Sequence, residues 1–337
     1  MIGQLEYLST TTRKERIRIG HHIDDMLVSC SFAGQKCYAS NFTLFQTENY
    51  GNCWKLESDQ FIETAPGYQE GLDIVLFMEN NEALAGISSG YGIRVNIHEQ
   101  NTLPFPTEEG FLVSTAFETH IALKKIDILR SDGNHGDCNS YADFEAEYGY
   151  KFTRQLCLAL CLQDEMLERC GCHSSTSEEY RVQLHKNHTR MCRSKPDREC
   201  EALVKLEQRR RLVPCRCTNP CKETKYSRVI TARQWPTDEY ANILVASVCE
   251  QRPEVCNHIV NKKKDSRSLS QGFLRLTIYY EDLNYEEMYE TPEIEVQQFA
   301  SDVGGAIGLW IGLSILSVFE LVQLAMELCV VGKRKLS

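Results

Sequence analysis

The chain lacks the sequence features that would assign it to several common classes of protein. It contains no H-E-x-x-H sequence and no phosphate-binding glycine loop, and no catalytic residue, cofactor or metal is expected. Basic residues do not predominate, since 37 Lys and Arg stand against 47 Asp and Glu, which argues against nucleic acid as a partner. Internal repeats and low-complexity linkers are also missing. The composition therefore indicates one large domain or two to three small lobes.

One long apolar run is present, from Ser301 to Val331 near the C-terminus. About 20 such residues cross a bilayer core of roughly 30 Å, so the run predicts a membrane-spanning helix. Glycines recur at 304, 308 and 312, which would allow close approach of another helix. A carboxylate within the run, Glu320, is costly in lipid and indicates an ion pathway. The alternative is a single-pass anchor whose Glu320 side chain reaches the membrane surface.

The cysteine content places the region before the span in an oxidising compartment. Fifteen of the 16 cysteines precede the span, and Asn41 and Asn187 each begin an Asn-x-Thr glycosylation sequon. The basic residues 333–335 follow the span directly. By the positive-inside rule, we expect a cytoplasmic tail and an extracellular location for the residues before Ser301.

The start of the chain does not explain how this region would cross the membrane. Met1 is followed by a polar segment without an apolar stretch, and the cysteines outside the span are odd in number once Cys329 is set aside. We interpret the sequence as a fragment that lacks an N-terminal membrane helix and one cysteine.

Periodicity predicts the order of the elements. Residues 1–137 are expected to be β-rich, 138–225 disulfide-rich and helical, 226–298 mostly returning strands, 299–331 the span and 332–337 the tail. The clearest predicted strands are 73–78, 93–97, 117–123 and 273–280, and the predicted helices are 152–169 and 199–211.

The spacing of the central cysteines favours parallel cross-links. Cys157 and Cys161 are four apart on a predicted helix, while Cys215 and Cys217 are two apart on an extended segment, so each pair shares a face. Spacing alone does not fix the connectivity. A zinc site formed by Cys170, Cys172 and His173 is the competing interpretation.

These cysteines resemble a known family. The spacing C-x3-C-x8-C-x-C from Cys157 to Cys172, followed by C-x-C-x3-C from Cys215 to Cys221, is similar to the thumb of the degenerin, epithelial sodium channel and acid-sensing ion channel family. Further segments resemble the family in the same order, so that the likeness covers nearly the whole chain: 29–37 with 50–54, 95–98 with 104–105, 283–286, and 302–321.

The resemblance implies an α+β membrane protein whose disulfide-rich extracellular domain has a central palm sheet, a β-ball, a helical thumb, finger lobes and a knuckle, followed by a C-terminal transmembrane helix. It implies the pairs Cys30–Cys37, Cys138–Cys221, Cys157–Cys217, Cys161–Cys215, Cys170–Cys200 and Cys172–Cys192. Cys249 and Cys256 lie outside that shared set and are expected to close their own loop. Cys53 is then left without a partner. In the family, the cysteine that pairs with it follows the first membrane helix, which would lie upstream of Met1.

The resemblance also implies a function. Family members are trimeric, amiloride-sensitive sodium channels of the plasma membrane, whose second membrane helix lines the pore. The narrowest part would fall on Gly312, Leu313 and Ser314, where carbonyls outside the helical ladder replace part of the ion's water shell. Leu313 is bulkier than the residue often found there, which leaves the exact ion selectivity open.

Further roles follow for residues flanking this tract. Asp302 would attract cations at the outer mouth, Glu320 would lie below the constriction, Ser301 would be the gating position of degenerins, and the glycines at 304, 305 and 308 would pack against neighbouring helices. Local alternatives are an N-cap role for Ser301 and a helix N-terminal acid for Asp302. The sequence identifies neither the extracellular activator nor homomeric or heteromeric assembly. A disulfide-rich receptor or adhesion ectodomain with a simple anchor is the alternative function.

Overall fold

The computed structural model describes residues 12–336, except for 48–49, 58–60, 63, 79, 81–89, 134–135, 175–189, 191, 211, 252, 254–255, 257–269 and 313. The chain divides into two compact units, Met1–Tyr289 and Glu290–Ser337. Each unit is described by itself.

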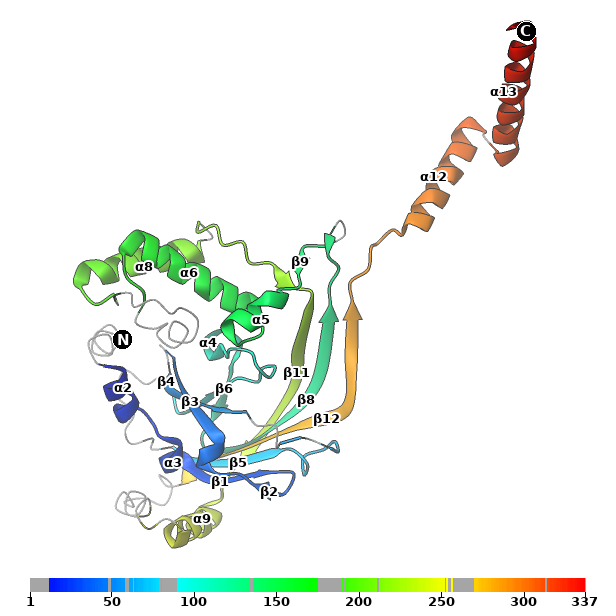
Figure 1. Cartoon of the computed structure of the whole chain (residues 1–337). Coiled ribbons are helices and arrows are strands. Elements are labelled where there is room, and N and C mark those ends of the chain that lie inside the picture. Colours follow the sequence, from blue (N-terminus) through cyan, green and yellow to red (C-terminus); the bar gives the residue numbers. More distant parts are fainter. Residues whose placement is uncertain are drawn as a thin grey trace. The chain divides into compact units, whose positions relative to one another are not determined.

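The first unit is built on a six-stranded sheet with the order β11-β8-β12-β5-β1-β2 (Figure 1). Neighbouring strands are antiparallel except β8 and β12, which run parallel. The strands are β1 (Leu27–Phe32), β2 (Gln35–Lys36), β5 (Leu72–Phe77), β8 (Phe117–Leu129), β11 (Lys222–Gln234) and β12 (Phe273–Tyr289).

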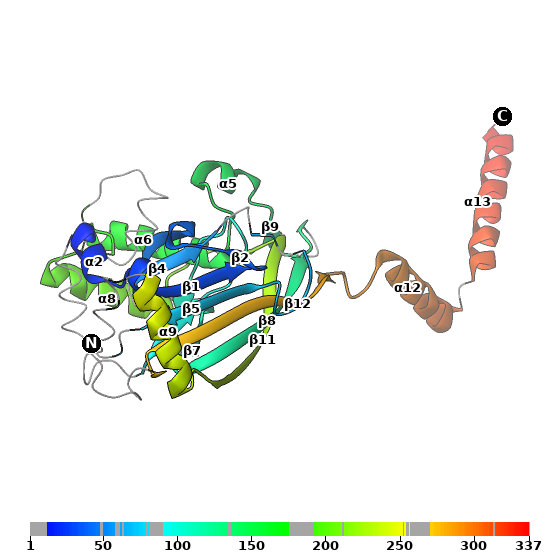
Figure 2. The same cartoon turned by 90° about the horizontal axis from the view of Figure 1, so that it is seen from below.

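The two faces of this sheet bury different partners because side chains alternate along each strand. Leu274 and Leu276 of β12 pack with Ile121 of β8 in the main core, as predicted from their shared face. Phe273, on the opposite face, packs against helix α9 (Asp238–Gln251) through Val248. Figures 1 and 2 both show α9 on the face of the sheet away from α6 and α8. The expectation of mostly returning strands did not include this helix.

A helical pair, α6 (Arg154–Cys170) and α8 (Lys195–Arg209), forms the disulfide-rich part. Thr153 caps α6 by accepting a hydrogen bond from the Leu156 amide, and Gly171 ends it with a φ of +63°. A capping box between Ser194 and Asp197 starts α8 four residues before the predicted position.

Shorter elements complete the first unit. Two-stranded sheets pair β3 (Phe42–Thr47) with β4 (Gly51–Leu56), β6 (Gly92–Val95) with β7 (Phe111–Ser114), and β9 (Cys138–Asn139) with β10 (Asn219–Pro220). Among the described residues, shorter helices are α2 (Arg13–Ile19), α3 (Ile23–Met26), α4 (Pro106–Glu109) and α5 (Ala142–Tyr148), with a 3-10 turn at Ala39–Asn41. The expected β-rich character of residues 1–137 therefore includes short helices.

Seven disulfides cross-link the first unit, and all seven expected pairings are confirmed. The zinc interpretation is wrong, because Cys170 is bonded to Cys200 and Cys172 to Cys192. Among the described cysteines, Cys53 and Cys329 are free.

The second unit consists of two helices, α12 (Val296–Ile311) and α13 (Ile315–Leu336). The predicted span, 299–331, is thus interrupted. α12 starts three residues before the predicted span, and α13 continues beyond its end.

Candidate ion pathway

A break separates α12 from α13. Gly312 adopts a left-handed conformation, with φ +66° and ψ 19°, and its amide donates to the Gly308 carbonyl oxygen at 3.0 Å. Glycine accepts this conformation without a steric penalty, so it is suited to end a helix. Ser314 then accepts a hydrogen bond from the Ser317 amide at 3.3 Å, as an N-capping residue does. Leu313 lies outside the described residues.

α13 is the part of the second unit with the length and polarity of a membrane span. Residues Ile315–Gly332 have a mean hydropathy of 1.9, and none of this window is buried within the chain. Within the part of the chain that the structure describes, it is the single helix that meets these criteria. Eighteen helical residues cover about 27 Å at 1.5 Å per residue, close to the thickness of a bilayer core.

The local alternatives for Ser301 and Asp302 are wrong, because both residues lie in the interior of α12. The helix is capped by Glu295 and has no acidic residue in its first turn. Ser301 Oγ donates to the Gln297 carbonyl oxygen at 2.9 Å, and Asp302 Oδ1 accepts from Gln298 Nε2 at 3.0 Å.

The other predicted pore residues lie along the same two helices. Glu320 is exposed on α13, one turn after Ser317, and the Gln323 amide donates to Glu327 at 3.1 Å further along. A Cβ atom added to Gly304 or Gly305 would meet nothing within 4 Å. Contacts within the chain therefore do not require glycine at these two positions.

Cys53 lies in the first unit and is one of the two free cysteines among the described residues. Its half-buried thiol lies 3.5 Å from Thr47 Oγ1, and burial raises the pKa of this thiol. A thiol with a raised pKa is a poor nucleophile, so Cys53 is not suited to catalysis.

Comparison with known proteins places the chain in a family. The profile of the family described as amiloride-sensitive sodium channel matches residues 4–324. The chain belongs to the amiloride-sensitive sodium channel family. This is a family of ion channels and not of enzymes.

The chain is similar to curated members from distant animals. It is 26% identical to the FMRFamide-activated amiloride-sensitive sodium channel of Cornu aspersum, over 92% of this chain and 62% of that protein. It is 27% identical to epithelial sodium channel subunit alpha of Mus musculus, over 92% and 44%, and 27% identical to degenerin-like protein unc-105 of Caenorhabditis elegans, over 93% and 35%. The chain thus spans less than two thirds of the length of each.

Proposed function

We propose that the chain is a subunit of a trimeric, amiloride-sensitive sodium channel in which ions pass a constriction at Gly312, Leu313 and Ser314. The observation that supports this most directly is the break between α12 and α13 at these residues. A break takes main-chain carbonyls out of the regular helical ladder, and such groups are tolerated at membrane depth where they line a water-filled path.

The polar residues of the two helices fit the same pathway. Asp302 precedes the break by ten positions and Glu320 follows it by eight, counted from Gly312. Three copies of each carboxylate around a threefold axis would attract cations on either side of the constriction. Ser301 would be the gating position, and the glycines at 304, 305 and 308 would face neighbouring subunits.

The topology and chemical modifications belong to the same proposal. The disulfide-bonded first unit would be extracellular in the plasma membrane, with N-linked glycans at Asn41 and at Asn187, which lies outside the described residues. Residues 332–337 would be cytoplasmic. The proposed partners are sodium ions, amiloride-type blockers, two further subunits, the bilayer and an extracellular activator.

Electrical recording from the full-length protein tests the proposal. We expect a sodium current that amiloride blocks, a large constitutive current when Ser301 is replaced by Val, and changed ion selectivity in Gly312→Ala. Asp302→Ala should lower the single-channel conductance. A simple receptor anchor would be indifferent to all three substitutions. Protein that reaches the cell surface but carries no current, even as Ser301→Val, would contradict the channel function.

A further inference from the structure

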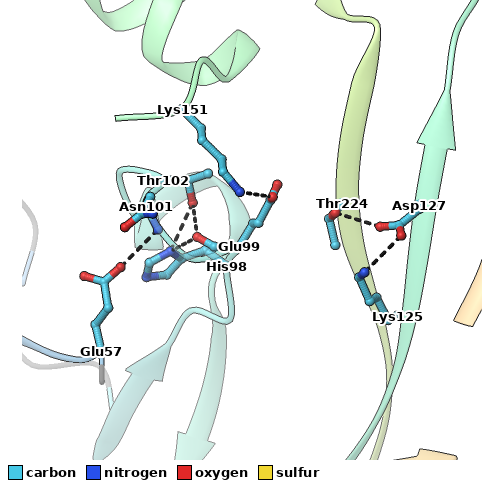
Figure 3. Close-up of polar contacts among 9 residues, drawn as sticks. All are labelled: Glu57, His98, Glu99, Asn101, Thr102, Lys125, Asp127, Lys151 and Thr224. Atoms are coloured by element: carbon cyan, nitrogen blue, oxygen red, sulfur yellow. Dashed lines mark hydrogen bonds and ion pairs between the residues drawn. The ribbon is translucent and has the colours of Figure 1, made fainter. Parts of the chain in front are cut away.

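The segment 96–105, called here the bridging loop, links two parts of the first unit. On one side, the backbone amide of Asn101 donates a hydrogen bond of 3.0 Å to Oε1 of Glu57, the residue that follows β4. On the other side, the Lys151 amide donates to the Asn101 carbonyl oxygen at 2.8 Å, just before α6. Lys151 Nζ also pairs with Glu99 Oε1 at 2.5 Å (Figure 3). The loop therefore contacts both the β3–β4 hairpin and the base of the helical pair.

Hydrogen bonds within the loop fix its shape. Thr102 Oγ1 donates to the Glu99 carbonyl oxygen at 2.6 Å, and His98 Nδ1 lies 3.0 Å from the same oxygen and 3.1 Å from Thr102 Oγ1. Thr102 is buried. These contacts hold the backbone around Glu99 in one conformation, so its carboxylate is presented toward Lys151 (Figure 3).

An apolar cluster anchors the loop to the helical pair. Leu103 and Phe105 are buried against Leu156, which lies in the first turn of α6. Burying such side chains is costly to reverse, whereas an ion pair at the surface is easily broken. The Lys151 and Glu99 side chains remain 39% and 27% exposed. The buried cluster should therefore stay packed when the helical pair moves, and the Glu99–Lys151 ion pair should be the contact that opens.

A second lysine, Lys125 on the sheet, has an acidic partner of its own. Lys125 of β8 pairs with Asp127 at 2.9 Å, and Thr224 of β11 donates to the same carboxylate at 2.7 Å. The Asp127 hydrogen bond is the main cause that raises the pKa of Lys125, and the charge of Glu99 adds to it. Lys125 is therefore engaged by Asp127, whereas Lys151 is the lysine that contacts Glu99.

We propose that the bridging loop couples the helical pair to the β3–β4 hairpin, with the Glu99–Lys151 ion pair as a latch that holds one state of the channel. This inference rests on the proposed channel function. Movement of the helical pair about the buried cluster would break the latch and release the Glu99 carboxylate.

Electrical recording from the full-length channel with Glu99→Gln and Lys151→Met tests the latch. Each should change the rate of current onset or decay by about two- to fivefold, the range expected for one partly exposed ion pair. The reversed pair E99K/K151E should return the rate toward that of the wild type.

A matched control is available within the helical pair. Arg169 pairs with Glu207 at the same 2.5 Å, with side chains 36% and 28% exposed, and joins α6 to α8 without touching the bridging loop. Glu207→Gln should therefore leave the rates within about 1.5-fold of the wild type. Equal effects of Glu207→Gln and Glu99→Gln would overturn the latch, as would wild-type kinetics in both Glu99→Gln and Lys151→Met at normal surface levels.

Two further measurements separate other causes of failure. If a variant does not reach the surface, Glu99→Ser or Lys151→Gln, which also remove the charge, replaces it, and wild-type kinetics in both overturn the latch. A wild-type protein without current contradicts the proposed function alone. Amide exchange at Asn101 and Lys151 of that purified protein still tests the latch, since Glu99→Gln should accelerate it and an unchanged rate overturns the inference.

Discussion

Arg233 Nε on β11 donates to Glu118 Oε2 on β8 at 2.5 Å, across a registered pair of strands. Glu118 is only 3% exposed and also contacts Arg275 Nη1 of β12 at 3.2 Å. Arg275 in turn pairs with Asp73 of β5 at 2.8 Å. Four neighbouring strands therefore carry charges of alternating sign on one face of the sheet.

Replacing Glu118 with Gln should destabilise the first unit by about 1.5–3 kcal/mol, the usual worth of hydrogen bonds to a charged group. Burial opposes ionisation of Glu118, but the hydrogen bonds from Arg233 and His120 outweigh it and lower the pKa of this carboxyl. The stabilisation by ionised Glu118 is therefore fully present above about pH 4.3, the pKa of an unfolded Glu. It is lost as the pH falls through the lower pKa of Glu118 in the folded state. Thermal unfolding of purified protein at pH 7 and pH 3.5 measures both effects.

The exposed pair of Lys124 and Glu281, at 3.8 Å, provides the control for Glu118. Glu281→Gln should change the stability by less than about 0.5 kcal/mol. If Glu118→Gln is no less stable than Glu281→Gln, the alternating charges on the four strands contribute little to the stability of the first unit.

The two parallel bridges from α6 should be strongly non-additive. Cys157–Cys217 and Cys161–Cys215 close loops of 60 and 54 residues, so either bridge alone restrains nearly the same unfolded segment. Removing one pair with serines should cost less than removing the second, while removing both should cost at most about 4 kcal/mol by loop entropy, because Cys138–Cys221 still closes the enclosing segment. Non-reducing thermal unfolding of the three variants measures this, and equal costs for the first and second bridges would contradict the entropic explanation.

Acid should weaken the bridging loop through His98. Burial is the largest influence on the pKa of His98 and lowers it, against the hydrogen bond with the Glu99 carbonyl. As the pH falls below about 6.5, His98 takes up a proton in the unfolded protein before it does so in the folded protein. The free energy of unfolding therefore falls by at most about 1.4 kcal/mol per pH unit. His98→Asn removes this contribution, and its melting temperature should fall less between pH 7.5 and pH 5.5. An identical fall in both proteins would mean that His98 titrates alike when folded and unfolded.

Enlarging Gly304 should affect assembly more than folding. The space beside it is empty within the chain, so a leucine there meets no obstacle in one subunit. If a second helix packs on that surface, Gly304→Leu should reduce the trimer fraction several-fold. Crosslinking at the cell surface measures the trimer, with Val303→Leu as a control of similar polarity. Normal assembly of Gly304→Leu would remove this glycine from the proposed contact.

Patterns that recur along the sequence predicted much of the fold. The alternating apolar residues of β12 and the helical spacing of Cys157 and Cys161 each identify the buried or bonded face directly. The resemblance to the channel family then selected one connectivity among many. α9 was missed although Ala241, Val245 and Val248 have helical spacing, since valine favours strands on propensity alone.

Other features could not be predicted because their causes are distant in sequence. Glu57 meets Asn101 and Glu99 meets Lys151 across 44 and 52 residues, and no periodicity connects them. The N-cap alternative for Ser301 was wrong for a local reason, since the apolar run begins later than α12 itself. Polar residues such as Gln297 and Gln298 continue the helix upstream of the run.

The bounds of β12 and α12 limit how far the first unit can move independently of α12. β12 ends at Tyr289 and α12 begins at Val296, so the connection has seven peptide steps and reaches about 25 Å at full extension. Pro292 stiffens it further. A connection this short cannot extend much further. If the end of β12 moves by more than this length allows, it must pull α12 along or unwind the first turn of α12.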